Sequence, residues 1–143
     1  RRIMDFLAEK YFSANSDSVT PSQKDLETFR KWNLRVLRAE SKISEVQKYI
    51  DLYMKNASSD LKSILYYEQS RIDTSSATQL SDLRSSLTSN PRNSDSLYAL
   101  YEYYFTKDDY RKARYYLRQV IALDSSNADL LNKNSQLDTL LSN

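Results

Sequence analysis

The sequence predicts an all-α fold of antiparallel helical hairpins, and three observations support this class. The 143 residues contain no glycine, which sheets and tight hairpin turns use at positive backbone angles. Apolar residues recur at spacings of three and four along most of the chain, which is the period of an amphipathic helix. The two prolines, Pro21 and Pro91, both lie in polar connections where helices end. The chain is therefore expected to contain no sheet.

Residues 1–59 are predicted to form an N-terminal helical region. Its helices are expected near residues 2–12, 22–39 and 42–55. The second begins after a Thr20-Pro21-Ser22 cap, and the third is either separate from it or continuous with it. The apolar stripe predicted for the second helix is Leu26, Phe29, Trp32 and Val36. The stripe predicted for the third is Ile43, Val46, Ile50 and Tyr53, widened by Tyr49 and Leu52.

Residues 60–93 are predicted to contain two further helices. The polar stretch 56–60 precedes the first of them, and the second is expected near 76–88, before Asn90 and Pro91. A turn-forming pair directly after a periodic segment is typical of a helix end.

The segment 94–127 has the clearest pattern in the chain. It is 34 residues long, and large, aromatic and small side chains recur in it at fixed places. These residues are Leu97, Leu100, Tyr104, Tyr110, Ala113, Leu117, Val120 and Leu123. The pattern resembles the tetratricopeptide repeat, a pair of antiparallel helices. Two positions depart from it, because Tyr101 replaces the usual glycine and Ser125 the usual proline.

The resemblance implies a short α-solenoid in which each hairpin stacks on the next. By the same register, 60–93 is a degenerate hairpin with Ser63 at a large position and Gln79 at the small one. Residues 1–59 resemble a repeat less closely. The leucine-rich segment 128–143 is expected to be a capping helix that covers the last apolar face.

Most catalytic chemistry is excluded by composition. The chain has no histidine and no cysteine, which excludes the usual triads and the common zinc sites, and without glycine it has no phosphate-binding loop. The adjacent pair Asp108 and Asp109 is interpreted as turn chemistry. We therefore expect no enzyme activity, no cofactor and no metal.

Candidate binding residues follow from the resemblance, which implies that Tyr98, Glu102 and Phe105 face a groove for an extended or helical peptide. The alternative for the aromatic side chains of this segment is core packing, which applies best to Tyr101 and Tyr104. A clamp for a terminal carboxylate is not expected, because acidic residues stand where such clamps have basic ones.

A second candidate surface is basic. Lys31, Arg35, Arg38 and Lys42 recur at spacings of four, three and four. This basic stripe suits an acidic partner, lipid head groups or phosphates, and its alternative is a solvated helix face. A smaller basic face is formed by Arg111, Arg114 and Arg118, with no aromatic residue interpreted as lying among them.

The function predicted from the sequence is a non-catalytic scaffold that binds a peptide or helix of another protein. One alternative is a structural subunit whose groove is filled internally, and another is a membrane-surface or nucleic-acid adaptor that uses the basic stripe. The net charge of only +2 disfavours nucleic acid. A cytoplasmic setting is favoured, although the absence of cysteine leaves the redox compartment open. A chain that begins with arginine is expected to be a fragment, so an upstream anchor or signal is not visible.

Overall fold

The computed structural model describes residues 22–142, which form seven helices and no strand. The helices are α2 (Gln23–Ala39), α3 (Ile43–Met54), α4 (Ser59–Ile72), α5 (Ser76–Ser89), α6 (Ser94–Thr106), α7 (Tyr110–Leu123) and α8 (Ala128–Ser142). The predicted all-α fold is confirmed. The helix expected near residues 2–12 lies outside the described residues.

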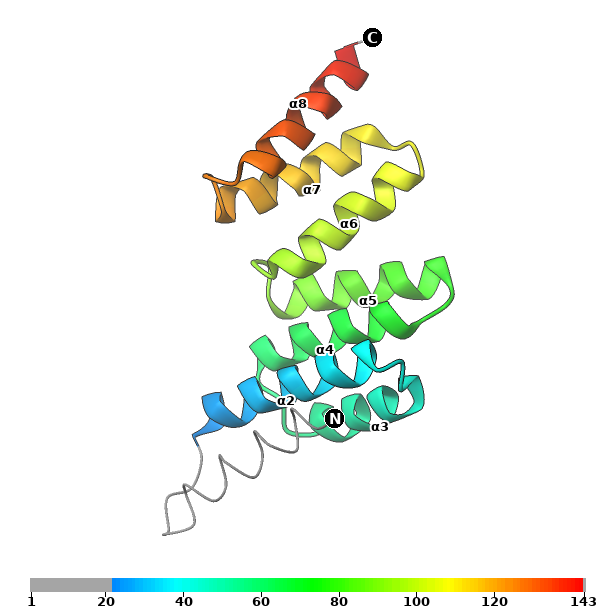
Figure 1. Cartoon of the computed structure of the whole chain (residues 1–143), viewed down its shortest axis with the longest axis vertical. Coiled ribbons are helices and arrows are strands. Elements are labelled where there is room, and N and C mark those ends of the chain that lie inside the picture. The colour runs from blue at the N-terminus through cyan, green and yellow to red at the C-terminus, as the bar shows by residue number, and fades with distance from the viewer. Residues whose placement is uncertain (1–21, 143) are drawn as a thin grey trace.

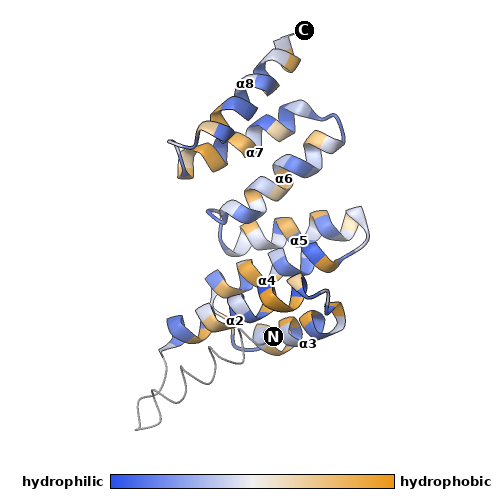
Figure 2. Cartoon of the chain, in the orientation of Figure 1, coloured by the Kyte–Doolittle hydropathy of each residue, from blue (hydrophilic) through white to orange (hydrophobic). Residues whose placement is uncertain are grey.

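The helices form an elongated stack of hairpins (Figure 1). The α2–α3 hairpin lies at one end, the α4–α5 and α6–α7 hairpins follow, and α8 lies at the other end. Consecutive helices pack on one another, and α2 also packs on α4. Each helix carries both hydrophilic and hydrophobic residues along its length (Figure 2). Such an array derives its stability mainly from contacts between neighbouring helices.

Short polar side chains begin five of the helices. Ser22, Ser58, Asn93, Asp109 and Asn127 each accept a hydrogen bond from the backbone N–H three residues further on, at 3.1 to 3.3 Å. The N-cap of α2 is thus Ser22, the last of the three residues predicted to form its cap, and Asp109 caps α7 from within the predicted turn.

Two helices end in left-handed turns without glycine. Ser41, with φ 60°, follows α2, and its neighbour Lys42 donates its N–H to the Leu37 carbonyl at 3.0 Å. Asp108, with φ 58°, follows α6, and the Asp109 N–H donates to the Tyr104 carbonyl at 3.0 Å. Both patterns are Schellman motifs, in which glycine usually occupies the left-handed position. The chain reversal at Ser41 shows that a continuous helix through this point is wrong.

The apolar core consists of two clusters. The first cluster joins α2, α3 and α4 through Leu34, Leu37, Val46, Ile50, Tyr53, Leu61 and Leu65. The second joins α5, α6, α7 and α8 through Leu83, Leu97, Ala99, Leu100, Tyr101, Tyr104, Ala113, Leu117, Val120, Leu130 and Leu137. The helices α4 and α5 form one hairpin but belong to different clusters.

A set of buried polar side chains lies between α4, α5 and the start of α6, and we call Ser63, Ser86, Asn93 and Ser96 the serine seam. The hydroxyls of Ser63 and Ser86 each donate to the other residue's carbonyl at 2.7 Å. The Ser96 hydroxyl lies 2.6 Å from the Ser86 hydroxyl, and the Asn93 amide donates to the Ser63 hydroxyl at 2.8 Å. Buried polar groups of this kind are tolerated because each has a partner.

The predicted apolar stripe of α2 is wrong. The helix buries Asn33, Leu34 and Leu37, whereas Trp32 is 50% exposed. The buried side is set by α3 and α4, which both pack on α2, and the Asn33 amide donates to the Tyr53 hydroxyl there at 2.8 Å. In α3, the predicted stripe is correct for Val46, Ile50 and Tyr53, but Ile43 and Leu52 are exposed.

Candidate partner-binding face

The helices α4, α6 and α8 form one face of the molecule. This face includes the three residues expected to line a groove. Tyr98, Glu102 and Phe105 lie at spacings of four and three on α6. Tyr98 is half-buried, and its hydroxyl accepts a hydrogen bond from Lys133 Nζ of α8 at 2.7 Å. The side chain of Glu102 is 51% exposed and lies 3.9 Å from Arg71 Nη2 of α4. Tyr98 and Glu102 thus contact the helices on either side of α6.

Phe105 is 38% exposed and lies between two other rings. Its ring centroid is 5.9 Å from that of Tyr101 and 5.5 Å from that of Tyr110. Phe105 therefore closes the end of the α6–α7 hairpin on one side while offering part of its ring to solvent.

Two hollows occur beside α6, and the three predicted residues do not line the same one. A hollow of about 240 Å³ lies between the start of α6, α4 and the α7–α8 corner, and Tyr98 lines it. A hollow of about 340 Å³ lies between the end of α6, α4 and α5, and Glu102 lines it. Phe105 lines neither. The residue common to both hollows is Arg71.

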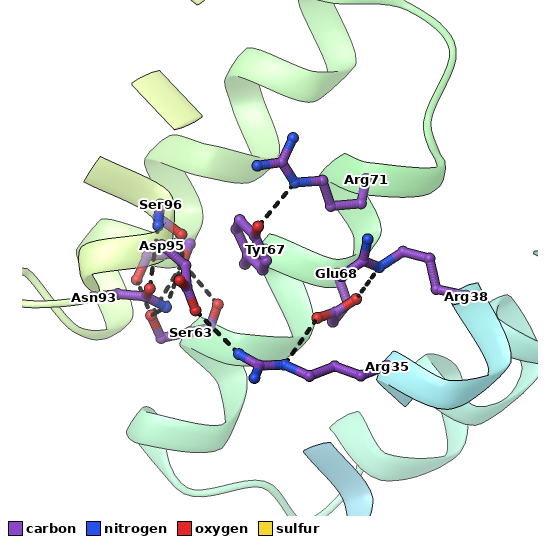
Figure 3. Close-up of polar contacts among 10 residues, drawn as sticks. Arg35, Arg38, Ser63, Tyr67, Glu68, Arg71, Asn93, Asp95 and Ser96 are labelled. Carbon is purple, nitrogen blue, oxygen red and sulfur yellow. Dashed lines mark hydrogen bonds and ion pairs between the residues drawn. The ribbon is translucent and has the colours of Figure 1, made fainter. Parts of the chain in front are cut away.

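Arg71 is a functional candidate that the sequence interpretation missed. Its Nε donates to the Tyr67 hydroxyl at 2.9 Å, and its guanidinium lies 4.9 Å from the centroid of that ring (Figure 3). The two residues are four positions apart on α4, a spacing that places them on one side of a helix. This spacing is the signal that was available in the sequence.

Hydrogen bonds and an ion pair hold Lys133 and Tyr98 in place on this face. Hydrogen bonds to Asp129 and to Tyr98 raise the pKa of Lys133, so its ammonium stays charged at neutral pH. Its Nζ lies 5.2 Å from the centroid of the Tyr98 ring, a cation–π distance. Burial raises the pKa of the Tyr101 hydroxyl beside it.

The basic stripe finds acidic partners within the chain. Arg38 Nε donates to Glu68 Oε2 at 2.8 Å, and Arg35 Nε lies 4.0 Å from Glu68 Oε1. Arg35 also donates to Asp95 of α6 at 3.1 Å, so one guanidinium reaches both α4 and α6 (Figure 3). Lys42 lies 3.6 Å from Glu40. The stripe is thus largely an internal ion-pair network.

Glu68 is the centre of that network and was not expected from the sequence. Its side chain is fully buried, and Oε1 accepts no hydrogen bond from the described residues. A buried carboxylate is tolerated when cations compensate it, as Arg35 and Arg38 do here. Lys31, the remaining member of the stripe, is half-buried on α2.

A carboxyl pair lies at the α4–α5 turn, away from this face. Asp73 follows α4, and its Oδ1 accepts a hydrogen bond from Gln69 at 2.9 Å. Burial, a hydrogen bond with Asp73 and the charge of Asp73 raise the pKa of Asp82 on α5 to about 7. The Asp82 carboxyl is therefore protonated over part of the physiological pH range.

The described residues contain neither a candidate membrane-spanning helix nor a cluster of metal ligands. Between residues 22 and 142, no helix has the length and apolarity that crossing a bilayer requires. Within the same range, no three acidic side chains gather as metal ligands do.

No protein-family model matches the sequence, and a search of curated proteins returns no match.

Proposed function

We propose that the chain is a non-catalytic scaffold that binds a peptide or helix of a partner protein on the face of α4, α6 and α8. The observation that carries this proposal is the pair of adjoining hollows beside α6, which share Arg71 and take in Tyr98 and Glu102. Tyrosine and arginine are the side chains that most often dominate protein–protein binding energies.

The positions of these side chains favour binding because they are fixed before a partner arrives. Lys133 holds Tyr98 by a hydrogen bond, and Tyr67 holds Arg71 by a hydrogen bond and ring contact. Side chains that are already ordered lose less conformational entropy on binding, and this improves affinity.

We also propose that the α6–α7 hairpin is a tetratricopeptide-like repeat. Support comes from Ala113, which is fully buried where α7 packs, and from the aromatic pair Tyr104 and Tyr116, whose rings stack at 5.7 Å with 3° between their planes. A small residue facing large ones is what close packing of two helices requires.

A structural subunit is the second candidate. It is favoured by the internal pairing of charges, since Arg71 and Lys133 on this face and Arg35 on α2 each contact an acidic side chain of the same chain. The adaptor alternative has less support, because Arg35 and Arg38 are engaged by Glu68 and Asp95.

Site-specific photocrosslinking separates these functions. A benzoylphenylalanine at Glu102 is expected to capture one discrete partner, whereas the same group at Ser81, an exposed α5 residue that lines neither hollow, is expected to capture none. Adding Arg71→Glu should abolish the capture, because Arg71 lines both hollows. Equal capture at Glu102 and Ser81 would contradict the proposal. A partner that co-purifies in fixed stoichiometry without crosslinking would favour the structural subunit.

A further inference from the structure

The outer face of α7 has a different character from the face of α4, α6 and α8. Arg111, Arg114 and Arg118 lie on it at spacings of three and four, and Tyr115 lies among them. These four residues, with Gln119 and Ala122, line a hollow of about 430 Å³. One aromatic residue, Tyr115, therefore lies among the arginines, fewer than the several rings that single-strand binders use. Tyr115 is 62% exposed, so its ring is offered to solvent.

The guanidinium groups of two of these arginines are held in place. Arg114 Nη1 and Arg118 Nη2 both donate to Asp138 Oδ1 of α8, at 2.9 and 3.3 Å. Each guanidinium has five N–H donors, so one bond to Asp138 leaves donors for a further acceptor. The Asp138 contact also shows which chemistry these side chains take, namely a carboxylate.

The Tyr115 ring is fixed by its neighbours. It meets the Tyr116 ring edge-on, at a centroid distance of 5.1 Å and an interplanar angle of 75°. Tyr116 in turn stacks on the buried Tyr104. The exposed ring is thus anchored to the core, and it loses little freedom when a ligand covers it.

Charge is unbalanced on this face. Three arginines stand against the single carboxylate of Asp138, which contacts Arg114 and Arg118. We propose that the outer face of α7 is a second docking surface, which takes an acidic helical segment of a partner protein. Carboxylates of the segment pair with Arg111 and Arg118, and an apolar side chain between them covers Tyr115.

A protein segment fits this surface better than a nucleic acid does. Single-strand binders present several rings on which successive bases stack, and here one exposed ring stands among the arginines. The whole chain carries a net charge of only +2, which gives little general attraction for a polyanion. Arginine with tyrosine is also a typical composition of protein-binding hot spots.

Fluorescence anisotropy tests the proposal with a defined probe. The probe is a labelled alanine-rich helical peptide whose glutamates are spaced by three and four, with one leucine between them. We expect saturable binding that weakens with salt, and about tenfold or greater loss of affinity with Arg111→Glu or with Tyr115→Ala. The same peptide with glutamine in place of glutamate is expected not to bind.

Two controls distinguish a local loss of binding from a general charge effect and from unfolding. Lys62→Glu makes the same charge reversal at an exposed α4 position and should change affinity by less than about twofold, since surface charges far from a site act weakly. Circular dichroism verifies that each variant keeps its helices. Absence of binding to the parent chain, or an affinity that neither α7 substitution lowers, would overturn the proposal. Tighter binding of an oligothymidine with the same dependence on Arg111 would also overturn it, by assigning the surface to nucleic acid.

Discussion

The α4–α5 and α6–α7 hairpins have nearly the same helix lengths but are closed by different chemistry. The α6–α7 hairpin packs Leu97, Leu100 and Tyr104 around the small side chain of Ala113, all of them buried. The α4–α5 hairpin instead brings Ser63 and Ser86 together, and each hydroxyl donates to the other residue's carbonyl. One hairpin is stabilised by apolar burial, and the other uses directional hydrogen bonds across its centre.

The comparison teaches that a small polar side chain can replace a large apolar one inside a helical pair, provided that every polar group is satisfied. Serine is small enough to let two backbones approach, and its hydroxyl then reaches the facing carbonyl. The two solutions respond differently to substitution. An apolar contact loses energy in proportion to the area lost, whereas a buried hydrogen-bond network leaves unpaired groups when one member is removed.

The largest expected effect is at the apolar hairpin. Ala113→Arg places a long charged side chain at a fully buried position where α6 and α7 touch. We expect a loss of unfolding free energy on the order of 3 kcal/mol or more, from overpacking and charge burial. Urea denaturation followed by circular dichroism measures it. Ala122→Arg, at an exposed position of the same helix, is the control and should cost less than about 0.5 kcal/mol. Equal stability of the two variants would refute the close contact at Ala113.

The serine seam is expected to give the next effect. Ser86→Ala removes the donor to the Ser63 carbonyl and the partner of the Ser96 hydroxyl, and both groups are buried. We expect a cost of about 2 kcal/mol, which is typical of leaving buried polar groups unpaired. Exposed Ser81→Ala on the same helix should change stability by only a few tenths of a kcal/mol. A double-mutant cycle with Ser63→Ala should show coupling, and strict additivity would mean that the seam does not act as a network.

The third expected effect is one of pH, and it concerns the turn of the α4–α5 hairpin. The pKa of Asp82 is raised to about 7 in the folded chain, against about 3.9 for an unperturbed aspartate. The folded state therefore binds more protons, so this pair stabilises the fold below about pH 4, and the contribution is lost as the pH rises to about 7. Asp82→Asn should remove this decline and be more stable than the parent chain above neutral pH. Urea titrations across this pH range measure the stability of each variant, with Ser81→Asn as the control. The raised pKa of Asp82 would be contradicted if the stability of the parent chain did not decline with pH.

Local signals were enough to predict most helix ends. The predicted helices 22–39 and 76–88 correspond to α2 and α5 within one residue, because Ser22 caps one and Asn90 ends the other. The break at Ser41 was left open because the left-handed residue is a serine, and neither glycine nor proline separates the two predicted helices. Sequence periodicity thus locates a helix, while its end depends on a conformation that several residue types adopt.

The buried side of each helix was harder to predict. Trp32 was expected inside because of its apolar character, yet α2 turns Leu34 and Leu37 inward, where α3 and α4 both pack. Glu68 was not expected in the interior, because its burial depends on partners far away in the sequence. The candidate residues Tyr98, Glu102 and Phe105 were placed on α6 as expected, but their contacts with α4, α7 and α8 could not be read from one helix alone.

The serine seam also has a consequence for how the chain loses its structure. It joins α4 of the first apolar cluster to α5 of the second, beside the apolar contact that Tyr67 of α4 makes with the second cluster. Parts of a fold that are joined by few interactions open locally when one of those interactions is weakened. We expect amide hydrogens of α4 and α5 near the seam to exchange at a lower free energy than those of α7.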